Sequence, residues 1–481
     1  MSTGVPGLDL ALKGGLPAGS VTLVRGPSGA GKTILGNQIC HHHVAEGGTA
    51  LFVTLLVENH ARMQLHMSQL GFHRQEAYEQ QLHFISAFRI LEEGGLDALH
   101  VVMLREIQRL GATLVVLDGF STAALLAPDD LALQKVVHQF QAQCTLFGCT
   151  MILLSPPRSE RLREAQGMVD CLIYLGMRVQ GRRLLRTITF RKMRGMDFLS
   201  GTHAYSISAA GIEVFPRIES IVDPDASRHT AGPARSTGLA TLDQLCSGGV
   251  STGSTTLVIG PPGIGKTTLG MHFLEPCGGD ETGLILGFYE TPPDLAAKAT
   301  RLGLNLEARL REGVVEMLWC PTLETTIDEI LTRLVKQLRS RRPRRVFIDS
   351  VAALRQLVDE PDRLSAIFTA LALELRNHGC TAMASVEVPT RSDPQDYALD
   401  QLSAEGVSAA GHNVVALRYL EYQNERRRTV SILKVRNQPL NPRVHLFEIT
   451  DGGVHIEPES VCLPTTGFRP ANAPERRAEN P

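Results

Sequence analysis

Two glycine-rich segments contain the residue types that bind phosphate groups. They read Gly26-Pro27-Ser28-Gly29-Ala30-Gly31-Lys32-Thr33 and Gly260-Pro261-Pro262-Gly263-Ile264-Gly265-Lys266-Thr267. Both fit the pattern G-x-x-x-x-G-K-[ST], in which the glycines let successive backbone N–H groups point at phosphate oxygens. A chance glycine-rich turn is the alternative, but it does not explain why the pattern recurs with matching flanks. The sequence therefore predicts two nucleotide-binding loops.

Each loop supplies a set of candidate ligands. The nucleotide ligands are expected to be Gly26, Ser28, Gly29, Ala30, Gly31, Lys32 and Thr33 in the first loop, and Gly260, Gly263, Ile264, Gly265, Lys266, Thr267 and Thr268 in the second. The two lysines would reach the β- and γ-phosphates, and the hydroxyls of Thr33 and Thr267 would bind Mg²⁺. The following helix adds the partial positive charge of its N-terminus.

An acid that orients Mg²⁺ is expected at the end of a later buried strand. Asp118 follows the apolar run 114–117, and Asp349 follows the run 346–348. Each aspartate could instead cap the next helix, or do both. The candidate metal ligands are thus Thr33, Asp118, Thr267 and Asp349, with Glu290 as a further candidate.

Hydrolysis also needs a carboxylate that orients and deprotonates water. Glu290 comes at the end of the strand that follows the second loop, whereas the matching position after the first loop is Val57. Glu58 lies one residue later, and one step along a strand turns the side chain to the other face. We therefore expect the first site to bind nucleotide but to hydrolyse it poorly, with Glu58 as its candidate carboxylate.

Short apolar runs that alternate with longer helical patterns must position these residues. The runs predicted as buried strands are residues 21–24, 50–54, 114–117, 151–154, 256–259, 284–286, 346–348 and 381–384. They lack in-and-out alternation, which suits a parallel sheet covered on both faces. Each half of the chain is therefore predicted to be an α/β domain with a mostly parallel sheet flanked by helices. Residues 186–192 and 428–434 are expected to form hairpin strands.

The two halves are copies of one another. Lys32 is matched by Lys266, 234 residues later, and the segment that begins Ser2-Thr3-Gly4 is matched by the one that begins Ser236-Thr237-Gly238. A period of this length indicates a duplicated domain. We expect a first domain at residues 1–222, a linker at 223–233, a second domain at 234–457 and a disordered tail at 458–481.

Composition narrows the class of protein. The 481 residues include 43% hydrophobic and 20% charged residues, an ordinary globular balance, and 48 basic against 50 acidic residues give a net charge of −2. That balance argues against an extended basic surface that binds nucleic acid. With only 5% aromatic residues, the composition gives no indication of a surface on which nucleic-acid bases would stack. Nine cysteines without a C-x-x-C pair suggest buried, reduced thiols. With neither a secretory signal nor an apolar run of about 18 residues, a cytoplasmic protein without membrane contact is expected.

The duplicated S-T-G start, the two phosphate loops and the acid-ended strands resemble the KaiC family of RecA-like ATPases. The late segments strengthen the resemblance, since Arg191-Lys192-Met193-Arg194-Gly195 and Leu433-Lys434-Val435-Arg436 are not general to phosphate-loop proteins. The resemblance covers about residues 1–457. It implies two tandem RecA-like domains, and a homohexameric double ring with ATP and Mg²⁺ held between adjacent subunits.

The resemblance also assigns roles to two pairs of cations. Lys192 and Arg194, and likewise Lys434 and Arg436, would reach the γ-phosphate bound to the neighbouring subunit and neutralise charge on the transferred group. The alternative is a surface strand with alternating cations. The family carries adjacent glutamates at the catalytic position, where this chain has Tyr289-Glu290 and Leu56-Val57. This departure supports a more active second ring.

The family resemblance also implies that the protein could phosphorylate itself. The resemblance implies a phosphorylated pair of adjacent serine and threonine residues in the second domain. This chain has Ser408 at the serine position but Ala409 at the threonine position, so only single-site autokinase activity is expected. The leading hypothesis is a hexameric ATPase with ATP and Mg²⁺ as cofactors. Its alternatives are an ATP-gated scaffold that recruits an unknown signalling protein, and, less favoured by the neutral charge, a DNA-stimulated motor. The basic run 339–345 and the triplet 41–43 of histidines are expected to be solvated surface.

Overall fold

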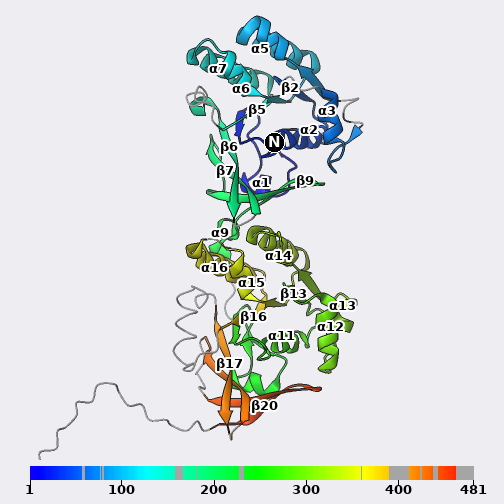
Figure 1. Ribbon diagram of the computed structural model, residues 1–481, viewed down its shortest axis with the longest axis vertical. Coiled ribbons are helices and arrows are strands. Elements are labelled where there is room, and N and C mark those ends of the chain that lie inside the picture. The colour runs from blue at the N-terminus through cyan, green and yellow to red at the C-terminus, as the bar shows by residue number, and fades with distance from the viewer. Residues whose placement is uncertain are drawn as a thin grey trace, which may run out of the picture. The chain divides into compact units, whose positions relative to one another are not determined.

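The computed structural model describes residues 1–56, 60–75, 77, 81–157, 166–180, 183–226, 232–358, 360–388, 411–422, 425–436 and 443–461. The chain divides into two compact units, the first made of Met1–Asp223 and Thr322–Gln337 and the second of Pro224–Pro321 and Leu338–Pro481 (Figure 1). Each unit contains one large sheet with helices packed against it. The two units are described separately below.

The first unit alternates strands and helices before it ends in hairpin strands. Its elements are α1 (Leu8–Ala11), β1 (Val21–Arg25), α2 (Lys32–Ala45), β2 (Ala50–Thr54), α3 (His60–Met67), β3 (Leu82–Ser86), α5 (Phe88–Leu110), β4 (Leu114–Asp118), α6 (Phe120–Leu126), α7 (Asp130–Phe147), β5 (Thr150–Ser155), β6 (Cys171–Gln180), β7 (Arg183–Met193), β8 (Thr202–Ser208), β9 (Gly211–Phe215) and α9 (Ile218–Ile221). The strand order is β3-β2-β4-β5-β1-β6-β7-β8-β9. Strands β3 to β6 of this order are parallel, and β7, β8 and β9 continue the sheet in antiparallel pairs.

The second repeat of the sequence, from residue 224 onward, follows the same plan. After the short helix η1 (Pro224–Ala226), its elements are β10 (Ala234–Arg235), α10 (Ala240–Leu245), β11 (Val250–Ser251), β12 (Thr255–Gly260), α11 (Lys266–Leu274), β13 (Gly283–Gly287), α12 (Pro292–Arg301), α13 (Leu306–Arg311), β14 (Val315–Trp319), α14 (Ile327–Arg341), β15 (Arg345–Asp349), α15 (Val351–Gln356), α16 (Pro361–Asn377), β16 (Thr381–Glu387), β17 (Asn413–Tyr422), β18 (Glu425–Lys434), β19 (Val444–Thr450) and β20 (Gly453–Ser460). The strand order β14-β13-β15-β16-β12-β17-β18-β19-β20 matches that of the first sheet position by position.

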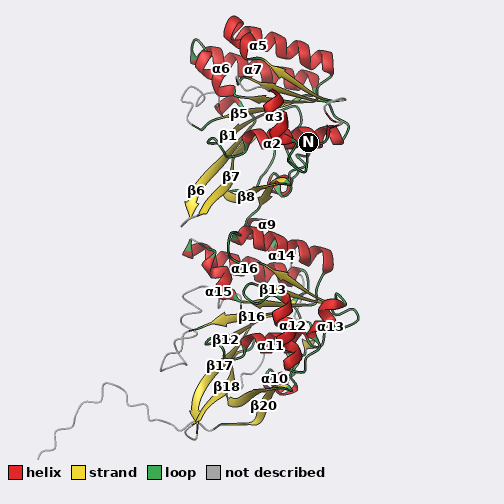
Figure 2. Ribbon diagram, turned by 45° about the vertical axis from the view of Figure 1, so that its right-hand side comes forward, coloured by secondary structure: helices red, strands yellow, loops and turns green. Residues whose placement is uncertain are grey.

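Both faces of the first sheet are covered, which explains the unbroken apolar runs of its strands. Leu23 and Leu117 pack into one core cluster with residues of α5, α6 and α7. Val24 and Val116 pack into another with residues of α1 and α2. Figure 2 shows α5, α6 and α7 on one side of this sheet and α2 on the other. The predicted α/β class, with a mostly parallel sheet flanked by helices in each half of the chain, is confirmed.

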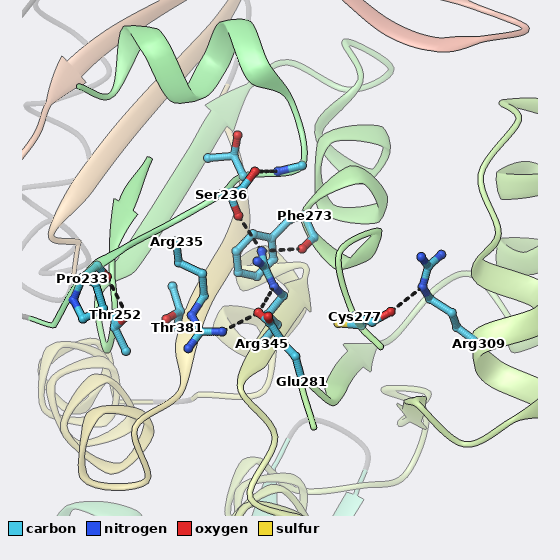
Figure 3. A network of polar contacts seen from close by, with 12 residues as sticks. Pro233, Arg235, Ser236, Thr252, Phe273, Cys277, Glu281, Arg309, Arg345 and Thr381 are labelled. Atoms are coloured by element: carbon cyan, nitrogen blue, oxygen red, sulfur yellow. Dashed lines mark hydrogen bonds and ion pairs between the residues drawn. The ribbon is translucent and has the colours of Figure 1, made fainter. Parts of the chain in front are cut away.

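The basic run 339–345 does not behave as a uniformly solvated turn. Arg345 begins β15 and its side chain is only 2% exposed. Its guanidinium donates to Glu281 at 2.6 Å and to the Phe273 carbonyl at 2.9 Å, and it also donates to the Ser236 carbonyl (Figure 3). Arg235 pairs with the same carboxylate. This network joins the start of the repeat to its core, and the prediction of a solvated run is wrong for Arg345.

The structure also shows, within the described residues, where the cysteines and the arginine triplet 426–428 lie. The cysteines there are buried, as expected for small hydrophobes. No helix in the described part of the chain is long and apolar enough to cross a membrane. Arg426, Arg427 and Arg428 lie within β18.

Candidate functional site

The two phosphate loops place their glycines in similar conformations and have nearly the same burial pattern. Gly31 and Gly265 cap α2 and α11 with φ angles of 86° and 119°, in the left-handed region. A Cβ at Gly31 would fall 2.6 Å from Ile207 Cδ1, and one at Gly265 would fall 2.7 Å from Ile449 Cδ1. Glycine is therefore required at both positions for the backbone angle and for packing against β8 and β19. The loop tips stay exposed, while Ala30 and Ile264 are buried as anchors.

The loop lysines lie over the start of their own loops. Lys32 Nζ donates to the carbonyls of Gly26 at 2.7 Å and Pro27 at 3.0 Å. Lys266 Nζ makes the same contacts with Gly260 at 2.9 Å and Pro261 at 2.8 Å. Burial lowers the pKa of both ammonium groups, although nearby carboxylates oppose the shift. Each lysine is thus a partly desolvated cation at the mouth of a helix N-terminus, which suits phosphate binding.

Each loop threonine is paired with the predicted strand-end aspartate. Thr33 Oγ1 donates to Asp118 Oδ2 at 2.7 Å, and Thr267 Oγ1 donates to Asp349 Oδ2 at 2.7 Å. A hydroxyl beside a carboxylate presents the hard oxygen ligands that Mg²⁺ prefers. In both repeats the residues present fit a magnesium site beside the phosphate loop.

A cleft of about 560 Å³ opens beside the second loop. Six predicted residues line it together: Gly263, Gly265, Lys266, Thr267, Thr268 and Glu290. Three charged residues that the sequence analysis does not name also line it, namely Lys298 and Arg301 of α12 and Asp451 after β19. A helix and a loop far along the chain thus complete the walls, and only the fold brings them to the phosphate loop.

Glu290 lies three residues beyond the end of β13 and faces this cleft. Its Oε1 accepts a hydrogen bond from Lys298 Nζ at 2.8 Å. Its Oε2 is buried and has no hydrogen-bond partner. A carboxylate at the wall of the cleft beside the phosphate loop is suited to orient and deprotonate a water molecule.

Strand register fixes which residue of the first repeat corresponds to Glu290. Thr54 stands opposite Asp118 in the first sheet, and Gly287 stands opposite Asp349 in the second. Counting three residues onward from each gives Val57 and Glu290. Val57 and Glu58 themselves lie outside the described residues.

A second difference between the repeats lies on the neighbouring strand. Asp118 is level with Leu154 on β5, whereas the hydroxyl of Ser385 on β16 donates to Asp349 Oδ1. One residue before the loop, Arg25 pairs with Ser155, so Pro156 corresponds to Glu387, which stands opposite Gly260. The charge of Glu387 acts on Lys266. The second site therefore has the polar Ser385 and the acidic Glu387 where the first has Leu154 and Pro156.

The two pairs of cations do not lie at the phosphate loop of their own repeat. The Arg194 amide donates to the Asp170 carbonyl, and Asp170 in turn accepts from the amide of Val21, at the start of β1. The loop begins at Gly26, roughly 16 Å along the strand at about 3.3 Å per residue. Lys192 donates to the Gly167 carbonyl at 2.7 Å on the same side.

The second repeat has the same arrangement. Lys434 stands opposite Val414 on β17 and donates to the Gly411 carbonyl at 2.7 Å. The Arg436 amide donates to Asn413 Oδ1 at 3.4 Å. These cations lie toward the end of β12 that is remote from Gly260, so they are not brought together with their own Lys266.

Two other predictions concern the histidine triplet and the phosphosite. His41 is buried and packs its ring against Phe72, with 5.6 Å between centroids, so the prediction of a surface position is wrong for this residue. His42 contacts Ser2 at 3.1 Å, and His43 contacts Thr113 at 2.7 Å. The three rings point to different partners, and no group of three metal-ligating side chains occurs in the described ranges. Ser408 lies outside the described residues.

The fold and the paired loops define a class: a duplicated α/β protein with two nucleotide-binding sites of the phosphate-loop type. A family model described as "ATPase: KaiC" matches residues 1–219 and 235–461. The chain therefore belongs to the KaiC family of ATPases, and the resemblance inferred from the sequence is confirmed.

Curated relatives agree with this family along nearly the whole chain. The chain is 25% identical over 474 residues to "Circadian clock oscillator protein KaiC" of Picosynechococcus sp., covering 94% of this chain and 88% of the relative. It is 24% identical over 476 residues to the protein of the same name from Prochlorococcus marinus, with 95% and 92% coverage. "Circadian clock oscillator protein KaiC 1" of Synechocystis sp. is 25% identical over 477 residues, with 94% and 88% coverage.

Proposed function

We propose that this chain binds ATP in both repeats and hydrolyses it chiefly in the second. The observation that carries the proposal is the cleft in which Lys266, Thr267 and Glu290 lie together. Membership of an ATPase family supports the reaction in general. The valine at position 57, where the second repeat has Glu290, supports the difference between the two sites.

The residues of the second site have complementary roles in this proposal. The loop amides and Lys266 bind the phosphates and neutralise charge that builds on the γ-phosphoryl group. Glu290 accepts a hydrogen bond from the attacking water and takes up its proton. Thr267 and Asp349 would hold Mg²⁺, which would supply positive charge to the phosphates when bound. The first site would bind the same nucleotide through Lys32, Thr33 and Asp118.

We propose a homohexameric double ring in which each nucleotide lies between two subunits. Lys192, Arg194, Lys434 and Arg436 support it because they lie far from the loop of their own repeat. In a ring, that side of one subunit would meet the loop of the next, and the cations would act on the neighbour's γ-phosphate. The proposed domains remain residues 1–222 and 234–457, joined by a linker at 223–233.

Autophosphorylation at Ser408 is part of the same proposal, although it rests on the family alone. Ala409 removes the second acceptor, so a two-site cycle is not expected, and the protein would act outside a full oscillator. Phosphopeptide mass spectrometry after incubation with ATP and Mg²⁺ tests this point. Absence of phosphate near residue 408 would leave the chain an ATPase, or a nucleotide-gated scaffold for a signalling protein.

Matched lysine variants test which repeat performs the chemistry. Lys266→Ala is expected to lose most ATP turnover, whereas Lys32→Ala should keep most of it, provided that both still form the oligomer. Size measurements with ATP, with ADP and without nucleotide accompany the assay. Equal losses in the two variants would contradict the assignment, and an oligomeric state that never changes would argue against gating by nucleotide.

A further inference from the structure

The ion pair between Lys298 and Glu290 joins α12 to the candidate catalytic carboxylate. Lys298 Nζ lies 2.8 Å from Glu290 Oε1, and both side chains line the cleft beside the second phosphate loop. The two side chains are 33% and 38% exposed. A pair this accessible contributes roughly 0–1 kcal/mol to stability, so its effect on the fold is small.

The start of α12 explains why Lys298 is directed to Glu290. Within a helix, the acid four residues before a lysine is its usual partner, and that acid here is Asp294. Asp294 is engaged instead with Thr291, the N-cap, whose hydroxyl it binds and whose side chain accepts from the Asp294 amide. Lys298, two turns along the helix, pairs with the carboxylate just before the helix begins.

The two carboxylate oxygens of Glu290 differ in their hydrogen bonding. Oε1 is held by the ammonium group, while Oε2 is buried without a hydrogen-bond partner. A carboxylate held by one oxygen cannot rotate freely, so the ion pair restrains the orientation of Glu290 beside the cleft. General-base catalysis depends on such fixed geometry, since small misplacements of a reacting group cost large factors in rate.

We propose that Lys298 is a positioning residue that holds the Glu290 carboxylate in place beside the attacking water. The proposal rests on the assignment of Glu290 as the base in the proposed function. Lys298 acts through Glu290 and transfers no proton itself. It should therefore affect the rate of hydrolysis and leave nucleotide affinity largely intact.

A double-mutant cycle tests the proposal in the full-length chain. Lys298→Met should lower kcat about 10- to 100-fold with little change in KM for ATP, and Lys298→Arg should recover much of the loss because it keeps the cation. In the Glu290→Gln background, Lys298→Met should cause no further decrease. Arg311→Met is the matched control, since Arg311 pairs with Glu307 at 2.9 Å on the neighbouring helix α13 and does not line the cleft. That control should keep full turnover.

The outcomes separate this proposal from the proposed function. If Glu290→Gln keeps its turnover, the assignment of the base is wrong. If Glu290→Gln loses turnover but Lys298→Met lowers it by the same factor in both backgrounds, Lys298 acts independently and the positioning role is wrong. A rise in KM with kcat unchanged would likewise overturn the role, because it would mean that Lys298 binds the nucleotide directly.

Discussion

The hydroxyl of Thr267 donates a 2.7 Å hydrogen bond to Asp349, and this contact joins the start of α11 to the end of β15. Thr33 and Asp118 make the same contact in the first repeat. The pair presents two hard oxygen ligands beside the phosphate loop, so it predicts a magnesium requirement.

Removing the Thr267 hydroxyl should weaken the binding of Mg²⁺ at the second site. We expect Thr267→Val to lower ATP turnover at saturating ATP and to raise the Mg²⁺ concentration needed for half-maximal rate at least tenfold. Thr267→Ser should keep both values near those of the parent, because it retains the hydroxyl. The measurement is turnover as a function of free Mg²⁺. An unchanged magnesium curve for Thr267→Val would contradict the assignment of this ligand.

The position of the second cation pair predicts that active sites are shared between subunits. Lys266→Ala damages the loop side of a site, whereas Arg436→Ala, combined with Lys434→Ala, damages the opposite side. Mixing these two inactive proteins under conditions that exchange subunits should restore part of the turnover, because some interfaces then combine an intact loop with intact cations.

A matched mixture serves as the control for that experiment. Lys266→Ala and Glu290→Gln both damage the loop side, so their mixture should stay inactive. Recovery in the control, or none in the test mixture despite proven exchange, would argue that the cations do not act across an interface.

The Arg345 network predicts a specific pH dependence of stability. Burial alone would raise the pKa of Glu281, but hydrogen bonds from Arg345 and Arg235 outweigh it, so the pKa lies below its usual value. A depressed carboxyl pKa stabilises the folded state above the ordinary glutamate pKa, and this contribution disappears as the pH falls through the folded pKa. Glu281→Gln should therefore cost about 1–3 kcal/mol near neutral pH.

Melting curves of the parent and of Glu281→Gln between neutral and acidic pH check this expectation. The gap between them should stay constant down to about pH 5 and narrow below about pH 4. Glu307→Gln is a suitable control, because its partner Arg311 is largely exposed. A gap that widens in acid would contradict the direction of the shift.

Much of the nucleotide site follows from local sequence, because a phosphate loop must lie between a strand and a helix. Lys266, Thr267 and Asp349 meet as expected, since strand ends in a parallel sheet share one edge. The edge strands β3 and β14 are absent from the predicted strands. Their side chains are only partly buried, so their apolar signal is weak.

Local sequence does not indicate the contacts that depend on three-dimensional packing. Lys298 lies eight residues after Glu290, and nothing in that spacing reveals that a capped helix turns the ammonium group back to the carboxylate. Arg345 stands in a run of basic residues that favours solvent, yet Glu281 and two backbone carbonyls compensate its burial. In both cases the partner is supplied by another element of the fold.

The central claim is that Glu290 performs the chemistry of the second site. The direct measurement is steady-state ATP turnover of Glu290→Gln in the full-length chain, alongside equilibrium binding of ATP. The account predicts that turnover falls at least about 100-fold, the usual contribution of a general base, while ATP remains bound to both repeats. Turnover within a factor of two of the parent protein would contradict it.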